Sequence, residues 1–128
     1  MTTRVERLKK LLILQEQLKA MHELRHAGFI AEAVAAKNDA AELVDRFNAE
    51  ESMSALFPEV YHRRIGSALS REDANRKLAT REAAKVATAT ARTNMVERTF
   101  REARAADERE RGDKERLDII GQRLKPGK

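Results

Sequence analysis

Cysteine and tryptophan are absent from this chain of 128 residues, which holds one tyrosine, four phenylalanines and two prolines. Without cysteine, disulfides, thiolate catalysis and cysteine metal sites are excluded. The scarcity of aromatic residues also argues against a compact globule. The apolar 41% is largely alanine, which buries too little surface to offset the entropy lost when a globular chain folds.

Charged residues make up 37% of the chain, and alanine, leucine, glutamate, arginine and lysine dominate it. These are the strongest helix formers, and the mixture is typical of long helices and coiled coils. The longest strongly apolar run, Leu11 to Leu14, is far shorter than a membrane span, and no secretory apolar region opens the chain. We therefore expect a soluble, cytoplasmic, all-α protein that does not insert into membranes.

The strongest break in the helical pattern lies in the middle of the chain, around Pro58. Proline removes a backbone donor and disfavours helix at the residue before it, and Ser70 followed by Asp73 has the form of a capping box. The pattern predicts one helix over 3–55, a turn over 56–69 and a second helix over 70–124, as a single hairpin domain. A helix over 60–68 would instead leave a tighter turn near Pro58.

Apolar residues recur at alternating spacings of three and four, the pattern of a coiled-coil seam. In the second helix this seam is predicted to hold Val86, Ala89, Thr93, Val96, Phe100 and Ala103, then Asp107, Glu110, Lys114, Leu117, Gly121 and Leu124. In the first helix it is predicted to hold Leu8, Leu11, Leu14, Leu18 and Met21, then Ile30, Ala33, Ala40, Val44 and Phe47. A slip in register is expected around Gly28.

Charge is distributed in blocks. Residues 31–59 carry two basic and seven acidic side chains, a net of −5, whereas residues 60–106 carry eleven basic and five acidic ones, a net of +6. Opposite charges on the two arms favour an antiparallel pairing. A turn near residue 62 would set each residue i beside about 124 minus i, which places Leu8 near Leu117. The sequence thus predicts two long helices in an antiparallel coiled-coil hairpin.

The most specific motif is His22-Glu23-Leu24-Arg25-His26, a literal H-E-x-x-H. On a helix it can bind zinc with two imidazoles, but a peptidase also needs a sheet and a third ligand, and the sequence indicates neither. Because Leu24 is expected on the seam, we interpret both histidines as solvent-facing residues. Glycine-rich phosphate-binding signatures are absent from the sequence. We predict no metal, no cofactor and no enzymatic activity.

The basic side chains of the second helix raise nucleic-acid binding as an alternative function. Acidic residues interrupt this basic run and no aromatic residue is interleaved with it, so charge pairing inside the hairpin is the simpler account. A general dimeric coiled-coil scaffold is the other alternative.

Both ends of the predicted hairpin are candidate partner-binding surfaces. Basic and apolar residues meet at the open end, where we select Arg4, Arg7, Leu8, Arg116, Leu117 and Arg123. Apolar residues gather at the turn, where Phe57, Tyr61, Ile65 and Leu69 either form a second contact surface or simply pack the turn. A charged tip with apolar residues is suited to a complementary protein socket.

The segments 4–12 (RVERLKKLL) and 108–120 (ERERGDKERLDII) resemble those of FliJ/YscO-type export proteins. Members of that family begin with an R-L-x-x-L-L-like helix and end in a charged E-x-x-x-x-x-K-x-x-D-E segment. Lys114 and Asp118 correspond to its lysine and aspartate, whereas Ile119 stands where the family usually has an acid.

The resemblance implies a stalk of the flagellar or injectisome type III export apparatus, a cytoplasmic component peripheral to the inner membrane. It implies that the terminal residues selected above bind the export ATPase ring and that the turn residues face the export-gate membrane protein. It further implies an escort role for export chaperones.

Overall fold

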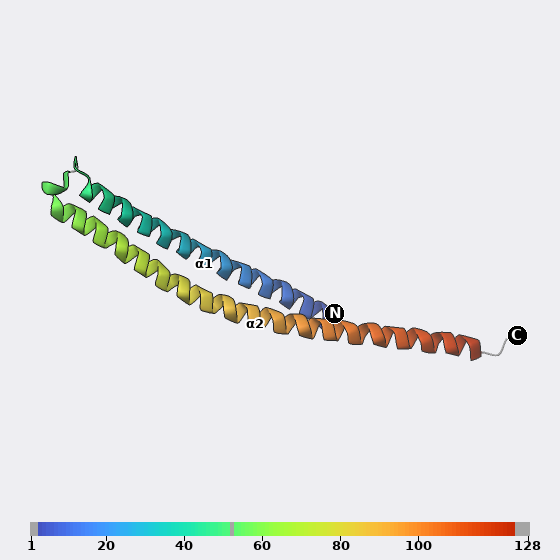
Figure 1. Ribbon diagram of the computed structural model, residues 1–128. Helices are drawn as coiled ribbons and strands as arrows, with labels where there is room; N and C mark the ends of the chain where they lie inside the picture. Colours follow the sequence, from blue (N-terminus) through green and yellow to red (C-terminus); the bar gives the residue numbers. More distant parts are fainter. Residues whose placement is uncertain (1–2, 52, 125–128) are drawn as a thin grey trace. The chain divides into compact units, whose positions relative to one another are not determined.

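The computed structural model describes residues 3–51 and 53–124. Helix α1 spans Arg4–Asn48, a short 3₁₀ helix η1 spans Met53–Ala55, and helix α2 spans Pro58–Leu124 (Figure 1). The two long helices pack against each other and no strand occurs among the described residues. The predicted all-α helical hairpin is therefore confirmed.

Helix α1 begins with a capping box. The backbone nitrogen of Glu6 donates to Thr3 Oγ1 at 3.1 Å, and the backbone nitrogen of Thr3 donates to Glu6 Oε2 at 3.3 Å. These two bonds satisfy donors that the first turn of a helix would otherwise leave unpaired. They also place an acidic side chain in the first turn, where the helix dipole favours negative charge.

The predicted helix boundaries are wrong around the turn. Helix α1 ends at Asn48 rather than at residue 55, and α2 begins at Pro58 rather than at Ser70. Proline is well suited to the first helical position, since it has no N–H to leave unpaired and its φ is already helical. The carbonyl of Phe57 accepts the backbone N–H of Val60 at 3.2 Å, which closes the first turn. The structure thus matches the alternative of a tight turn near Pro58.

The face of α1 that packs on α2 follows one uninterrupted spacing of three and four, so the predicted slip near Gly28 does not occur. These residues, which we call the α1 seam, are Val5, Leu8, Leu12, Gln15, Lys19, His22, His26, Phe29, Ala33, Ala36, Ala40, Leu43 and Phe47. Most of the predicted apolar seam lies outside it: Leu11, Leu14, Leu18, Met21, Ile30 and Val44 are all exposed. The prediction followed the largest apolar residues, whereas the helices meet along alanines and polar residues.

The α2 seam was predicted correctly from Val86 to Asp107. It consists of Tyr61, Ile65, Ala68, Glu72, Asn75, Ala79, Glu82, Val86, Ala89, Thr93, Val96, Phe100, Ala103 and Asp107, all buried or half-buried. Alanine dominates the fully buried positions, with Ala33 and Ala68 at 0% exposure. Small residues at these positions allow the helices to approach closely.

The register of the hairpin differs from the predicted one. Asp39 pairs with Arg71 and Phe47 contacts Tyr61, so facing residue numbers sum to about 108–110 rather than 124. The shift follows from the turn, which lies near residue 53 rather than near residue 62. The predicted pairing of Leu8 with Leu117 is wrong, because Leu117 is 68% exposed.

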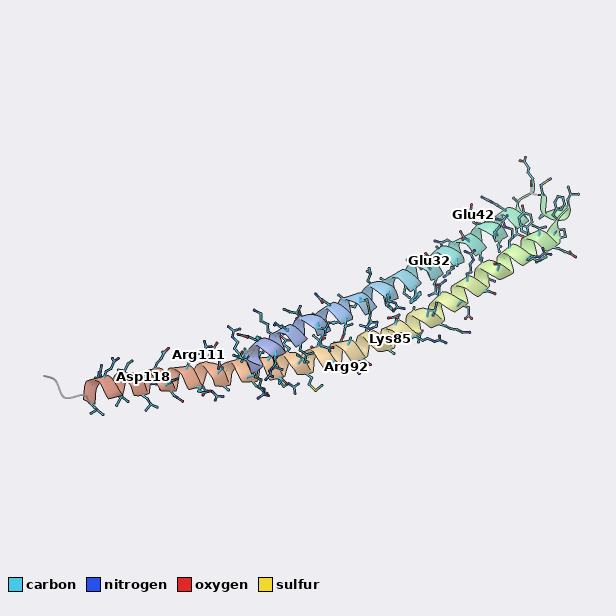
Figure 2. All side chains as sticks on the ribbon, turned by 180° about the vertical axis from the view of Figure 1, so that it is seen from behind. Glu32, Glu42, Lys85, Arg92, Arg111 and Asp118 are labelled. Carbon is cyan, nitrogen blue, oxygen red and sulfur yellow. The ribbon has the colours of Figure 1, made fainter. Side chains whose placement is uncertain are left out.

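The chain divides into two compact units, one formed by Lys19–Thr88 and the other by Met1–Leu18 with Ala89–Lys128. In the second of these, which we call the terminal unit, the start of α1 lies beside Ala103–Glu110, and residues 3–5 share one hollow with that stretch. Beyond it α2 continues to Leu124 with no part of α1 beside it (Figure 1). Figure 2 labels Arg111 and Asp118 on this part of α2. Residues 113–124 are all exposed, and we call 111–124 the protruding segment.

Candidate functional site: the seam carboxylate and the two ends

An acidic side chain lies inside the seam between the helices. Glu82 is 2% exposed, and among the described residues it is the one charged side chain that is buried. It occupies the α2 seam position four residues before Val86, so the spacing that places Val86 against α1 also places the carboxylate there.

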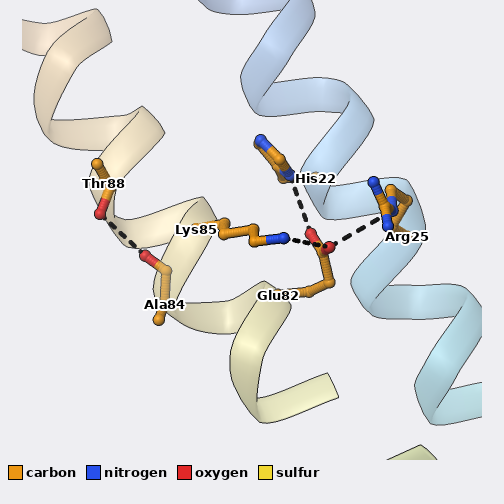
Figure 3. A network of polar contacts seen from close by, with 6 residues as sticks. All are labelled: His22, Arg25, Glu82, Ala84, Lys85 and Thr88. Atoms are coloured by element: carbon orange, nitrogen blue, oxygen red, sulfur yellow. Dashed lines mark hydrogen bonds and ion pairs between the residues drawn. The ribbon is translucent and has the colours of Figure 1, made fainter. Parts of the chain in front are cut away.

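Three basic groups surround the Glu82 carboxylate (Figure 3). His22 Nδ1 of α1 lies 2.9 Å from Oε2 and, because an ionised carboxylate only accepts, it is the donor. Arg25 Nε, one turn along α1, lies 3.4 Å from Oε1, and Lys85 Nζ of α2 lies 3.5 Å from the same oxygen. Both carboxylate oxygens are therefore paired. We call these four residues the Glu82 cluster.

The cluster keeps Glu82 ionised. Desolvation alone would raise the pKa of Glu82, but the hydrogen bond from His22 and the positive charges of Arg25 and Lys85 outweigh it and lower the pKa below 4.5. The side chains of Arg25 and Lys85 remain 52% and 55% exposed, so these two cations keep much of their hydration. A buried charge that finds partners only in one register specifies that register.

The histidines of the H-E-x-x-H motif do not face solvent as predicted. His22 and His26 lie on the α1 seam and are half-buried, whereas Leu24, predicted on the seam, is 75% exposed. The physical reason is the face of α1 that meets α2: the seam residues lie one position after the large apolar residues that were predicted to form it. No group of three or more histidine, aspartate or glutamate side chains with metal-binding geometry occurs among the described residues. His22 instead binds a carboxylate.

The residues predicted at the terminal end lie apart from one another along the terminal unit. Leu8 is half-buried in the seam, while Arg4, Arg7, Arg116, Leu117 and Arg123 are exposed. Arg4 lines a hollow with Glu110, and Arg123 lies thirteen residues further along α2, roughly 20 Å away at 1.5 Å per residue. Arg116 pairs with Asp113 of its own helix at 2.7 Å. Their binding role stays a prediction.

The four apolar residues predicted at the turn divide into two kinds. Tyr61 and Ile65 are half-buried on the α2 seam, and the ring of Tyr61 meets that of Phe47 edge-on with centroids 5.8 Å apart. Phe57 and Leu69 are 52% and 51% exposed. The first two therefore pack the hairpin, and the outward-facing pair is the part available to a partner.

Sequence reasoning missed the Glu82 cluster, although its signal was present. Extending the spacing of the second helix backwards from Val86 by four residues reaches Glu82, although the predicted sum of 124 sets Glu42 rather than His22 opposite it. It also missed a row of exposed leucines on α1, Leu11, Leu14 and Leu18, because these were taken for the seam.

No protein-family model, no curated protein and no solved structure matches the chain. Within the part of the chain that the structure describes, no helix is both long and apolar enough to cross a membrane.

Proposed function

We propose that the chain is a non-enzymatic stalk of a flagellar or type III protein export apparatus, which binds the export ATPase ring with its terminal end. The resemblance of its first and last segments to FliJ/YscO-type proteins suggests this role, and the shape of the terminal unit supports it. Its turn end faces the export gate, and the stalk escorts export chaperones at the cytoplasmic face of the membrane.

The observation that carries the proposal is the unequal length of the two helices. Helix α2 continues past the start of α1, so the end of the terminal unit is a single helix rather than a pair. A single helix is about 10–12 Å across with its side chains, half the width of a helical pair. It therefore fits a narrower axial socket than a helical pair would.

The surface of the protruding segment suits such a socket. Leu117, Ile120 and Leu124 are 68%, 51% and 77% exposed at spacings of three and four, so they form one apolar row. Arg116 and Arg123 lie beside this row and are also exposed. Apolar anchors flanked by basic groups favour a protein partner with an apolar and acidic lining.

The test is recovery of the ATPase from the native host. We expect tagged chain to co-purify with a hexameric ATPase, and we expect Leu117→Asp to reduce the recovery at least tenfold. Leu24→Asp is the matched control, because Leu24 is 75% exposed and lies outside the terminal unit. A pull-down without ATPase, together with unchanged motility and secretion after gene deletion, contradicts the proposal.

A further inference from the structure

The terminal unit carries a second exposed row, on α1, that its own helices leave uncovered. Leu11, Leu14 and Leu18 are 40%, 50% and 37% exposed and follow one another at spacings of three and four. Continuing this spacing towards the start of the helix reaches Arg7 and then Arg4, both exposed. We call these five residues the α1 row.

The end of α2 carries a row with the same spacing and a complementary order of charge. It consists of Glu110, Asp113, Leu117, Ile120 and Leu124, all exposed. Each member lies 106 residues after a member of the α1 row: Glu110 after Arg4, Asp113 after Arg7, and the three apolar residues after Leu11, Leu14 and Leu18. We call this set the α2 row.

Two helices side by side in parallel, offset by 106, would match these rows throughout. Acids would lie opposite bases at the first two positions and apolar residues opposite apolar residues at the next three. Arg4 and Glu110 share a hollow within one chain, but the other four pairs cannot form there, because α1 and α2 run in opposite directions and the protruding segment lies past the start of α1. The partner that fits the α1 row is therefore the α2 row of another copy.

We propose that two copies of this chain associate through a reciprocal exchange, in which the α2 row of each lies along the α1 row of the other. A two-fold axis makes both contacts at once, so the interface is closed and self-complementary. The lengths agree, since residues 4–18 and 110–124 both span 15 residues, roughly 21 Å between end residues. Each contact turns two helices of one copy and one of the other into a three-helix bundle.

Charge distinguishes this orientation from the reverse one. An antiparallel pairing of the same leucines would set Leu11 opposite Leu124, but it would take Asp113 away from Arg7. It would also align the α2 helices of the two copies in one direction but displaced along their length, and a two-fold axis along parallel helices allows no such displacement. Asp113 already holds Arg116 at 2.7 Å and is 67% exposed, so an oxygen remains accessible to a second cation.

This self-association goes beyond the proposed export role, and it covers the tip that would enter the ATPase ring. A stalk protein stored in this form would expose its tip only on dissociation. The test uses the isolated chain without any ATPase, so self-association and ATPase binding fail or succeed independently.

Sedimentation equilibrium gives the first test. We expect twice the chain mass of 14.5 kDa at about 100 μM, falling towards 14.5 kDa on dilution. Leu117→Asp should remain at 14.5 kDa, and the control Leu24→Asp should behave as the wild type. Leu117 contacts no part of α1, so the variant keeps its fold. A wild-type chain at single mass throughout, or a dimeric Leu117→Asp variant, overturns the proposal.

The charged positions give a second test. Arg7→Asp and Asp113→Arg should each weaken dimerisation about tenfold, because each removes two symmetric contacts and places like charges together. The double variant should recover most of the loss. No recovery in the double variant contradicts the pairing of these two residues.

Cysteine cross-linking tests the register directly, since the chain has no cysteine of its own. Leu14→Cys combined with Ile120→Cys should form a covalent dimer on mild oxidation. Leu18→Cys combined with Leu117→Cys should not form one. The two positions differ by 99 residues, seven fewer than the proposed offset of 106, so their sulfurs lie roughly 10 Å apart along the helix axis, beyond disulfide reach. Cross-linking of the second pair alone would overturn the parallel arrangement.

Discussion

Overfilling the alanine seam is the perturbation that best tests how closely the helices approach. Ala68 is 0% exposed on the α2 seam, and the register places Ala40, which is 5% exposed, opposite it. Ala68→Leu adds three heavy atoms at a position that is fully buried between the helices. Additional carbons in a closely packed core cost about 1–3 kcal/mol. The difference in helix propensity between alanine and leucine is much smaller, about a few tenths of a kcal/mol.

Urea denaturation followed by far-ultraviolet circular dichroism measures the effect. A loss of about 2 kcal/mol lowers the midpoint by about 1 M for a slope of about 2 kcal/mol per molar. Ala74→Leu is the control, since Ala74 is exposed on the same helix and should change stability by less than about 0.5 kcal/mol. If Ala68→Leu is as stable as the control, or more stable than the wild type, the seam has room for leucine and the close approach is refuted.

Three further predictions concern polar contacts. Because the pKa of Glu82 is lowered in the folded state, its ionised carboxylate stabilises the fold above pH 4.5, and this stabilisation is lost as the pH falls through the folded pKa. The difference in melting temperature between wild type and Glu82→Gln should therefore be largest at pH 7 and should shrink in acid. Thr3→Ala removes the cap of α1 and should cost about 1 kcal/mol in urea denaturation, and an unchanged midpoint would contradict the capping box. Both side chains of the Asp39–Arg71 ion pair are exposed, so Asp39→Arg should lower the free energy of unfolding by up to about 1 kcal/mol. Adding Arg71→Asp should recover this loss, which a double-mutant cycle measures.

The seam of α2 could be predicted from sequence and that of α1 could not, for one physical reason. From Val86 to Asp107 the apolar spacing has no competitor, so pattern and packing agree. On α1 two rows at the same spacing lie side by side, one of leucines and one that runs through Gln15 and Lys19 into the alanines. The pattern favours the leucines, but Ala33, Ala36 and Ala40 allow the closest approach of the two helices. The face of α1 that contains these alanines is therefore the one buried along its whole length.

The turn was predicted at the wrong place because a proline such as Pro58 is compatible with either the end or the start of a helix. Proline ends a helix when it lies inside one, yet it also starts one, and the sequence alone does not distinguish the cases. The seam spacing through Tyr61, Ile65 and Ala68 was the deciding signal. This displacement of the turn moved every predicted cross-helix partner, and it left the protruding segment without the α1 partner expected for it.

The same displacement also changes where the predicted binding residues lie. Leu117 was expected to lie near Leu8, and it is instead exposed on the protruding segment. Arg116 and Arg123 remain available on the surface, whereas Tyr61 and Ile65 pack the hairpin. The Glu82 cluster was not predicted at all, because a charged residue at a seam position is ordinarily rejected before its partners across the register are considered.

The proposed export role depends on the protruding segment binding an ATPase ring, and the rate of ATP hydrolysis by that ring is its most direct measurement. Purified hexameric export ATPase from the same host should hydrolyse ATP faster as the chain is added, with saturation at one chain per hexamer. Leu117→Asp should abolish this stimulation and Leu24→Asp should retain it. Unchanged turnover with the wild-type chain, or equal stimulation by both variants, would contradict the proposal that this segment is the tip of an export stalk.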